Sequence, residues 1–137
     1  MDVRTMGPEI TAYLEAPRYG VIATHDPDGG IWQAVVWYVL TGAVVLMNAR
    51  DGRHWLTNLR HDPRLSLVVA DGEDYVILRG QATVIDDPVR GLADAMALAR
   101  HYGDDPDTFA GQRRVSVVFQ PEHVGLHGQL LLSQRST

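Results

Sequence analysis

Residues 19–40 of the chain, YGVIATHDPDGGIWQAVVWYVL, hold two runs of β-branched and aromatic residues on either side of a turn cluster. Such runs are typical of strands, and the Asp-Pro-Asp-Gly-Gly cluster at 26–30 favours a tight hairpin between them. Acids in a turn also occur in calcium loops, but the downstream oxygen ligands and the closing glutamate of such a loop are missing. The stretch therefore predicts an antiparallel pair of strands.

Runs of the same kind occupy much of the remaining chain. They are AVVLMNA at 43–49, RLSLVVA at 64–70, YVILRGQATVID at 75–86, RRVSVVFQ at 113–120 and the shorter HVGLHG at 123–128. Helical spacing of apolar residues is confined to three stretches: 8–16, a segment around Trp55 and Leu59, and a segment from Pro88 to Gly103. Six or seven strands and three short helices in a single domain over residues 1–137 indicate a mainly β (α+β) protein, an antiparallel barrel or sandwich. Of the two, we predict a barrel.

Part of this predicted barrel is apolar on both faces of its strands. Residues 31–40 and 43–47 are nearly continuous in apolar residues, whereas a strand with one buried face alternates apolar and polar side chains. A barrel of this size cannot cover both faces with its own helices. We therefore expect a homodimer whose interface covers the second face.

The composition excludes several classes of function. Twelve basic against seventeen acidic residues give a net charge of −5, which disfavours a generic binder of nucleic acid or of anionic membranes. All twelve basic residues are arginine, so Schiff-base, P-loop and general-base lysines are excluded. The lack of cysteine excludes disulfides and thiolate chemistry, and we expect a cytoplasmic protein. The N-terminal segment lacks the apolar core of a signal peptide, and no apolar run is long enough to span a membrane.

The segment VVLMNARDGRHWLTNLRHDPR, residues 44–64, predicts a strand that runs through a turn into a helix. A helix start offers unpaired N–H groups and a partial positive charge, and Arg50 and Arg53 flank this one, so it is a candidate phosphate site. Asn48 could donate a further hydrogen bond. The alternative is that Asp51 caps the helix and both arginines lie in solvent, which the spacing alone favours slightly. Arg60, His61 and Arg64 lie just beyond and could border a groove for an extended anionic ligand, or they could form a solvated helix face.

Catalytic side chains are not evident in the sequence. The six histidines lack the spacing or companions of a metal site, no serine sits in a nucleophile elbow, and no paired carboxylates indicate a glycosidase. Trp32, Trp37, Tyr38 and Trp55 could stack on a planar ligand that Arg79 and Gln81 reach, although such aromatic residues mostly lie in cores. An anion site, aromatic strands and no acid–base residues together suggest that a bound cofactor carries the chemistry.

From about Tyr13 to Asp86, these stretches resemble the flavin and deazaflavin oxidoreductases of the pyridoxamine 5′-phosphate oxidase-like split-barrel superfamily. The most specific part is the pattern GR-x₄-NL-x₂-DPR, formed by Gly52, Arg53, Asn58, Leu59 and Asp62-Pro63-Arg64. It is similar to the signature of the branch that often binds the deazaflavin coenzyme F(420). The chain departs from the family pattern at His54, where lysine is common, and at Ala34-Val35, where Ser-Pro is common.

The resemblance implies a six- to seven-stranded FMN-binding split barrel that pairs as a homodimer, with the cofactor in a groove at the subunit interface. Reduced F(420) would transfer a hydride to a small unsaturated organic substrate, with Tyr38 or solvent giving the proton. FMN is the alternative cofactor, in an oxidase or reductase of the same fold, and a non-catalytic flavin- or haem-binding protein is a third possibility. The residues expected to bind the cofactor, with Arg79 supplied by the other subunit, are Trp32, Gln33, Ala34, Val35, Val36, Asn48, Ala49, Arg50, Gly52, Arg53, His54, Asn58 and Arg79.

Overall fold

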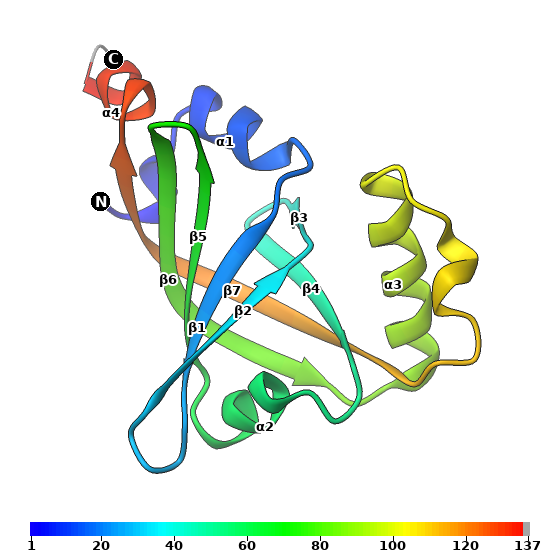
Figure 1. Ribbon diagram of the computed structural model, residues 1–137. Coiled ribbons are helices and arrows are strands. Elements are labelled where there is room, and N and C mark those ends of the chain that lie inside the picture. Colours follow the sequence, from blue (N-terminus) through cyan, green and yellow to red (C-terminus); the bar gives the residue numbers. More distant parts are fainter. Residues whose placement is uncertain (136–137) are drawn as a thin grey trace.

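A computed structural model describes residues 1–135 of the chain, as seven strands, four α-helices and two 3-10 helices (Figure 1). The strands are β1 (Gly20–His25), β2 (Ile31–Val36), β3 (Tyr38–Thr41), β4 (Val44–Arg50), β5 (Arg64–Asp71), β6 (Asp74–Ile85) and β7 (Arg114–His127). The α-helices are α1 (Pro8–Glu15), α2 (His54–His61), α3 (Pro88–His101) and α4 (Gln129–Arg135), and the 3-10 helices are η1 (Val3–Thr5) and η2 (Pro106–Phe109).

All seven strands form one antiparallel sheet with the order β2-β1-β5-β6-β7-β4-β3. The sheet curls round on itself (Figure 1). It encloses a core that includes Met47, Leu67, Leu78 and Phe119, each fully buried. The predicted hairpin between β1 and β2 is present, and its turn closes with a hydrogen bond from the Asp26 N–H to the Gly30 carbonyl. The prediction of a mainly β, antiparallel split barrel is confirmed.

The run at 31–40, expected to be a single strand, is two strands that break at Trp37. β2 pairs with β1 at one edge of the sheet and β3 pairs with β4 at the other edge. The Tyr102 hydroxyl fixes this crossing, because it accepts a hydrogen bond from the Tyr38 N–H and donates one to the Arg18 carbonyl. The chain thus passes from one free edge directly to the other, and the barrel is split between them.

The two closing strands expected at 113–120 and 123–128 are one strand, β7. Pro121 has no N–H to donate to a sheet, but it lies opposite Gly80 at a bulge in the pairing of β6 with β7. A Cβ at Gly80 would lie 2.1 Å from the Gln120 carbonyl oxygen, so only glycine permits this approach. The segment DDPDT at 104–108, whose residue types are typical of a turn, largely forms the 3-10 helix η2.

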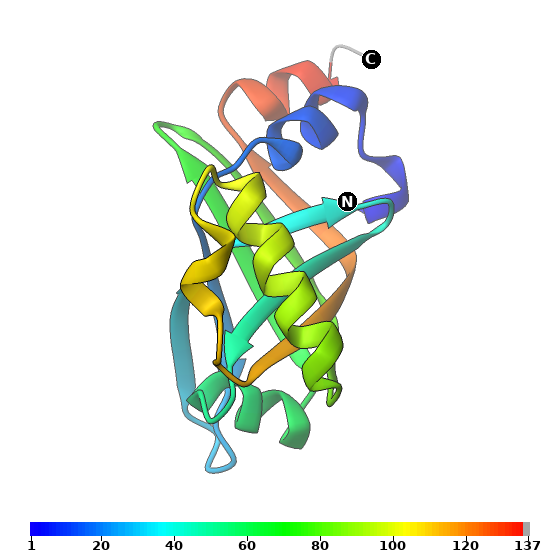
Figure 2. The ribbon, with the colours of Figure 1, turned by 90° about the vertical axis from the view of Figure 1, so that its right-hand side faces the viewer.

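The helices cover different parts of the barrel (Figures 1 and 2). α2 lies at one end, α1 and α4 pack against each other at the opposite end, and α3 lies along β7 and β4 with η2 beside it. Contact between α3 and β7 is very close, because a Cβ at Gly91 would lie 1.9 Å from the Arg114 carbonyl oxygen. Asp87 caps α3, and its side chain accepts hydrogen bonds from the N–H groups of Val89 and Arg90.

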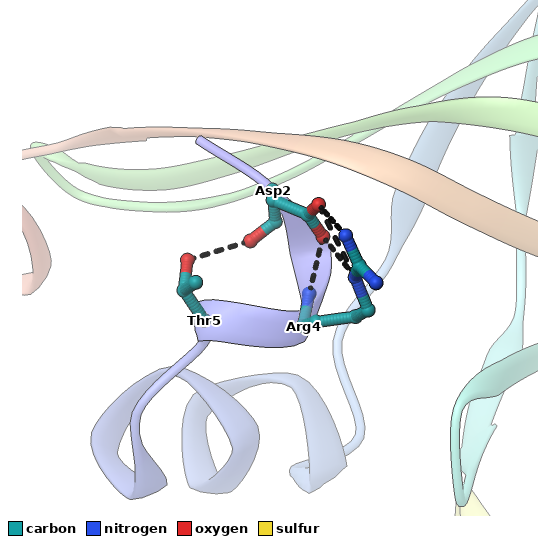
Figure 3. Close-up of polar contacts among 3 residues, drawn as sticks. All are labelled: Asp2, Arg4 and Thr5. Atoms are coloured by element: carbon teal, nitrogen blue, oxygen red, sulfur yellow. Dashed lines mark hydrogen bonds and ion pairs between the residues drawn. The ribbon is translucent and has the colours of Figure 1, made fainter.

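The N-terminus is attached to the last strand. Met1 and Val124 exchange backbone hydrogen bonds, and Asp2 forms an isolated bridge with His123. Asp2 also caps η1 and holds the Arg4 guanidinium, while the Thr5 hydroxyl donates to the Asp2 carbonyl (Figure 3). These bonds place α1 next to α4, with the Gly7 N–H donating to the Gln134 side chain.

Candidate functional site

A hollow of about 720 Å³ opens where the barrel is split, bounded by β2, the end of β4, the start of α2, α3 and η2. This volume lies within the range of pockets that hold a cofactor or a drug-sized ligand. Eleven of the thirteen residues expected to bind a cofactor line it: Trp32, Gln33, Ala34, Val35, Val36, Asn48, Ala49, Arg50, Gly52, Arg53 and His54. Asn58 and Arg79 do not.

The turn between β4 and α2 places arginines on the wall of this hollow. Gly52 has φ +93°, a conformation that L side chains rarely adopt, and it turns the chain from the end of β4 into the helix. The cap expected from Asp51 is not formed, because its carboxylate accepts from Arg113 Nε at 2.8 Å. Arg53 occupies the N-cap position with no side-chain capping bond. The first N–H groups of α2 therefore have no capping side chain, which leaves the helix start open to an anion.

A third arginine, which the sequence analysis missed, stands beside these two. Arg114, at the start of β7, lies directly opposite Arg50 in the strand register and lines the hollow. Its Nε donates to Asn48 Oδ1 at 2.9 Å and its Nη1 to Gln112 Oε1 at 3.0 Å. Within residues 1–135, none of the three arginines forms an ion pair. Burial, followed by the charges of Arg53 and Arg50, lowers the pKa of Arg114.

The gathering of three guanidinium groups is unfavourable in the protein alone. Like charges directly opposite each other in a sheet destabilise it, and Arg114 is in addition half-buried. A bound anion would compensate this repulsion. The only signal for Arg114 in the sequence is an Arg-Arg pair at the start of a strand, and its place opposite Arg50 requires the strand register.

Asn48 and Asn58 have different roles from those expected of them. The Asn48 amide donates to the Gly91 carbonyl and accepts from Arg114, so it joins β4 to α3 and orients the arginine. Asn58 is fully buried, and its amide donates to Thr24 Oγ1 and Asp26 Oδ1. Asn58 therefore does not line the hollow in one subunit, and its two hydrogen bonds join α2 to the β1–β2 hairpin.

His54, which replaces the lysine common in the family signature, is held by the hairpin. Its Nε2 lies 2.7 Å from Asp26 Oδ1, and its ring lies 4.2 Å from the Trp32 ring between centroids. Hydrogen bonds from His54 and then Asn58 lower the pKa of Asp26. The imidazole and the indole together form the side of the hollow next to the start of α2.

Arg79 lies on a second hollow, of about 430 Å³, between β1, β5, β6 and β7. Arg64 and Gln81 line the same hollow, and no residue is shared with the first. Arg60 lines neither hollow and pairs with Asp86, while Arg64 also pairs with Asp62. The groove expected along Arg60, His61 and Arg64 is therefore not part of the first hollow.

The end of the first hollow away from α2 is aromatic. Trp37 stacks on Tyr102 with ring centroids 4.8 Å apart and meets Phe109 edge-on at 6.2 Å. Tyr19, Leu98 and Phe109 line this end, and none of them was expected from the sequence. Tyr38 is fully buried in the core, its hydroxyl has no hydrogen-bond partner among residues 1–135, and burial strongly raises its pKa. The expectation that Tyr38 donates a proton in the hollow is therefore wrong.

Neither a metal-binding cluster nor a membrane-spanning helix is found in the described part of the chain. Across residues 1–135, no three histidine or acidic side chains are grouped so that they could hold a metal ion. Among the helices that the structure describes, none is long and apolar enough to cross a membrane.

Comparison with known proteins identifies the family. The family model described as pyridoxamine 5′-phosphate oxidase matches residues 6–128, and the chain belongs to this family. The structure is similar to that of an F(420) reductase, with a TM-score of 0.74 and 25% sequence identity, over 83% of this chain and 94% of that one. No curated protein matches the chain.

Two more solved structures share the fold at lower identity. The haem storage protein HutZ from Vibrio cholerae has a TM-score of 0.74 and 16% identity, over 90% of this chain and 95% of its own. A FAD-binding protein from Mesorhizobium loti has a TM-score of 0.65 and 20% identity, over 87% and 91%. The fold of this pyridoxamine 5′-phosphate oxidase family is thus shared by a protein described as an F(420) reductase, by a FAD-binding protein and by a haem storage protein.

Proposed function

We propose that the protein is a reductase that uses the deazaflavin coenzyme F(420) and reduces a small unsaturated organic substrate. The observation that carries this proposal is the hollow at the split of the barrel, whose wall holds arginines without ion pairs at an uncapped helix start. The similarity to an F(420) reductase, at 25% identity, favours the deazaflavin over FMN. When bound, the reduced coenzyme supplies a hydride, which with one proton converts a C=C or C=N bond to its saturated form.

The residues of the hollow fit such a group. Arg53, Arg50 and the first N–H groups of α2 would hold its phosphate, since charge-assisted bonds to planar guanidinium groups suit phosphate oxygens. β2 is an edge strand, so its outer N–H and C=O groups are unpaired in the sheet and can bond the polar edge of a flat ring. Trp32 and His54 would enclose the same ring from the side. The remaining lining residues of the binding set are Gln33, Ala34, Val35, Val36, Asn48, Ala49 and Gly52.

In this proposal the residues of the chain orient the cofactor and exclude water from it, and they do not transfer the proton. Apolar side chains from β2 and α3 exclude water from one side of the hollow. Because Tyr38 is sealed in the core, we assign the proton that completes the reduction to solvent.

We also propose that the protein is a homodimer paired through β2. The side chains of Ile31, Trp32 and Val35 on this strand keep 69%, 44% and 68% of their surface exposed, which leaves an apolar surface for a second subunit to cover. In this proposed dimer, the partner subunit's Arg79 would reach the cofactor from its second hollow, the role that the family resemblance implies. Sedimentation of the wild type should give twice the mass of one chain, and Val35→Asp should shift it to the monomer. A monomeric wild type at micromolar concentration contradicts the dimer.

The proposed function is tested by titrating the purified protein with F(420), FMN and haem, followed by absorbance and fluorescence. We expect saturable binding of F(420), and oxidation of reduced F(420) when an activated alkene is added. Tight binding of FMN alone assigns the protein to the flavin branch instead. Binding of haem, or of F(420) without any turnover over a panel of alkenes, imines and quinones, supports a binding protein and contradicts the reductase.

A further inference from the structure

The hollow has two chemically different ends, and the proposed cofactor accounts for one of them. The end at α2 carries Arg53, His54 and Trp32. The other end, formed by α3, η2 and the crossing between β2 and β3, carries Trp37, Phe109 and Leu98. Arg114 lies between these ends, beside Arg50 on the sheet and beneath Phe109.

Arg114 is held in a fixed orientation by three contacts. Its Nε and Nη1 donate to Asn48 and Gln112, and its Cζ lies 4.3 Å from the centroid of the Phe109 ring. Nη2 has no hydrogen bond to the described residues, yet the side chain lines the hollow. A guanidinium with two nitrogens anchored and the third free is well suited to bind one anionic group at a defined position.

The aromatic end next to Arg114 is also held in place. One face of the Trp37 ring is covered by Tyr102, whose hydroxyl is bonded to the backbone at Tyr38 and Arg18. Phe109 stands edge-on to Trp37, in a T-shaped pair. Rigid aromatic side chains in this arrangement favour a flat conjugated ligand, because offset or edge contacts with its ring add to the burial of apolar area.

We propose that this end of the hollow binds the substrate, and that the substrate is a flat conjugated carboxylate. Its ring lies against Trp37 and Phe109, and its carboxylate binds Arg114. This inference rests on the proposed function, because the bound compound is a substrate only if the protein is a reductase. The binding of such a compound can be measured with or without a cofactor. It makes Arg114 a specificity-determining residue rather than part of the cofactor phosphate site.

Cinnamate and cinnamamide serve as the probes. They have the same conjugated ring system, but cinnamate carries the negative charge that would bind Arg114 and cinnamamide is neutral. Binding is followed by NMR titration of the tryptophan indole signals, in cofactor-free protein and in protein loaded with whichever cofactor binds. We expect cinnamate to bind at least tenfold more tightly than cinnamamide, as for a charge-assisted hydrogen bond, and to shift the Trp37 signal.

Three variants separate the parts of the proposal. Arg114→Gln should remove the preference for cinnamate, whereas Phe109→Leu should weaken both probes alike. Arg113→Gln is the matched control, because Arg113 neighbours Arg114 in sequence but pairs with Asp51 outside the hollow, and it should keep the preference.

Several results overturn this inference. They are equal binding of the two probes by the wild type, no binding of either, or a preference that survives in Arg114→Gln. A loss of F(420) affinity in Arg114→Gln with unchanged cinnamate affinity would assign Arg114 to the cofactor. If no cofactor binds at all, the proposed function fails, while the titration of cofactor-free protein still decides the carboxylate site.

Discussion

Arg53→Ala is the sharpest test of the proposed cofactor site. Arg53 is exposed, occupies the N-cap position of α2 without a capping bond and has no ion pair with the described residues. Its removal therefore breaks no contact that stabilises the free protein. We expect the free energy of unfolding of the cofactor-free variant to stay within about 0.5 kcal/mol of the wild type.

The effect on cofactor binding should be much larger. A hydrogen bond to a charged group contributes about 1.5–3 kcal/mol, and each 1.4 kcal/mol is tenfold in affinity, so the Kd should rise roughly 10- to 100-fold. Calorimetry in one buffer measures this change, and thermal unfolding of the same samples measures stability. Raising the salt concentration should weaken the wild type more than the variant, because salt screens the contact that the variant lacks.

Arg60→Ala is the control on the same helix. Arg60 lies in the last turn of α2, pairs with Asp86 and does not line the hollow. Its cofactor affinity should equal that of the wild type. If Arg53→Ala and Arg60→Ala both bind with wild-type affinity, the junction between β4 and α2 does not bind the phosphate and our site assignment is wrong.

Three further changes test the surrounding structure. Gly91→Ala places a Cβ against the Arg114 carbonyl and should lower the free energy of unfolding by at least about 1–3 kcal/mol, measured by urea denaturation. Gly125→Ala should be nearly neutral, because the added Cβ would lie 3.8 Å from its nearest neighbour, Ile77. Asn58→Ala should cost about 1–3 kcal/mol of stability and leave the cofactor affinity of the folded protein within about threefold, contrary to a role in binding. Asp26→Asn should lower the Tm at pH 7. Because the wild-type carboxyl has a lowered pKa, it stabilises the fold above its ordinary pKa of 3.8, and the difference in Tm should shrink as the pH falls below about 4. A difference in Tm that does not change between pH 7 and pH 3 contradicts the bond to His54.

The sequence predicted the strands and most of their limits because most strands, β2 excepted, have one buried face and because the turns between them have strong local signals. It did not predict the break at Trp37, since Val36 and Tyr38 on either side are both buried and the apolar run continues through the crossing. Pro121 made β7 look like two strands. The bulge that accommodates Pro121 lies in β6 at Gly80, about forty residues earlier in the chain. Such features depend on long-range pairing, which local patterns do not contain.

The candidate site was predictable only as far as it is local. Ten of the eleven predicted residues that line the hollow come from β2, β4 and the turn before α2, and His54 is the first residue of that helix. Arg114, Trp37 and Phe109 reach the same hollow from β7, the crossing and η2, and neither their residue type nor their spacing distinguishes them from core or surface residues. Asn58 matched a signature that does not separate a ligand contact from a buried amide.

Three features that lower the stability of the free chain lie together at the split of the barrel. Arg50 and Arg114 are like charges at paired positions, α2 begins without a capping side chain, and the edge strand β2 exposes Ile31 and Val35. Each of these features costs stability in the free chain. Natural proteins keep such costs mainly at functional sites, where a ligand or a partner offsets them. A bound anion would offset the first two costs and a second subunit would offset the third, which is why we propose both occupants for the same hollow.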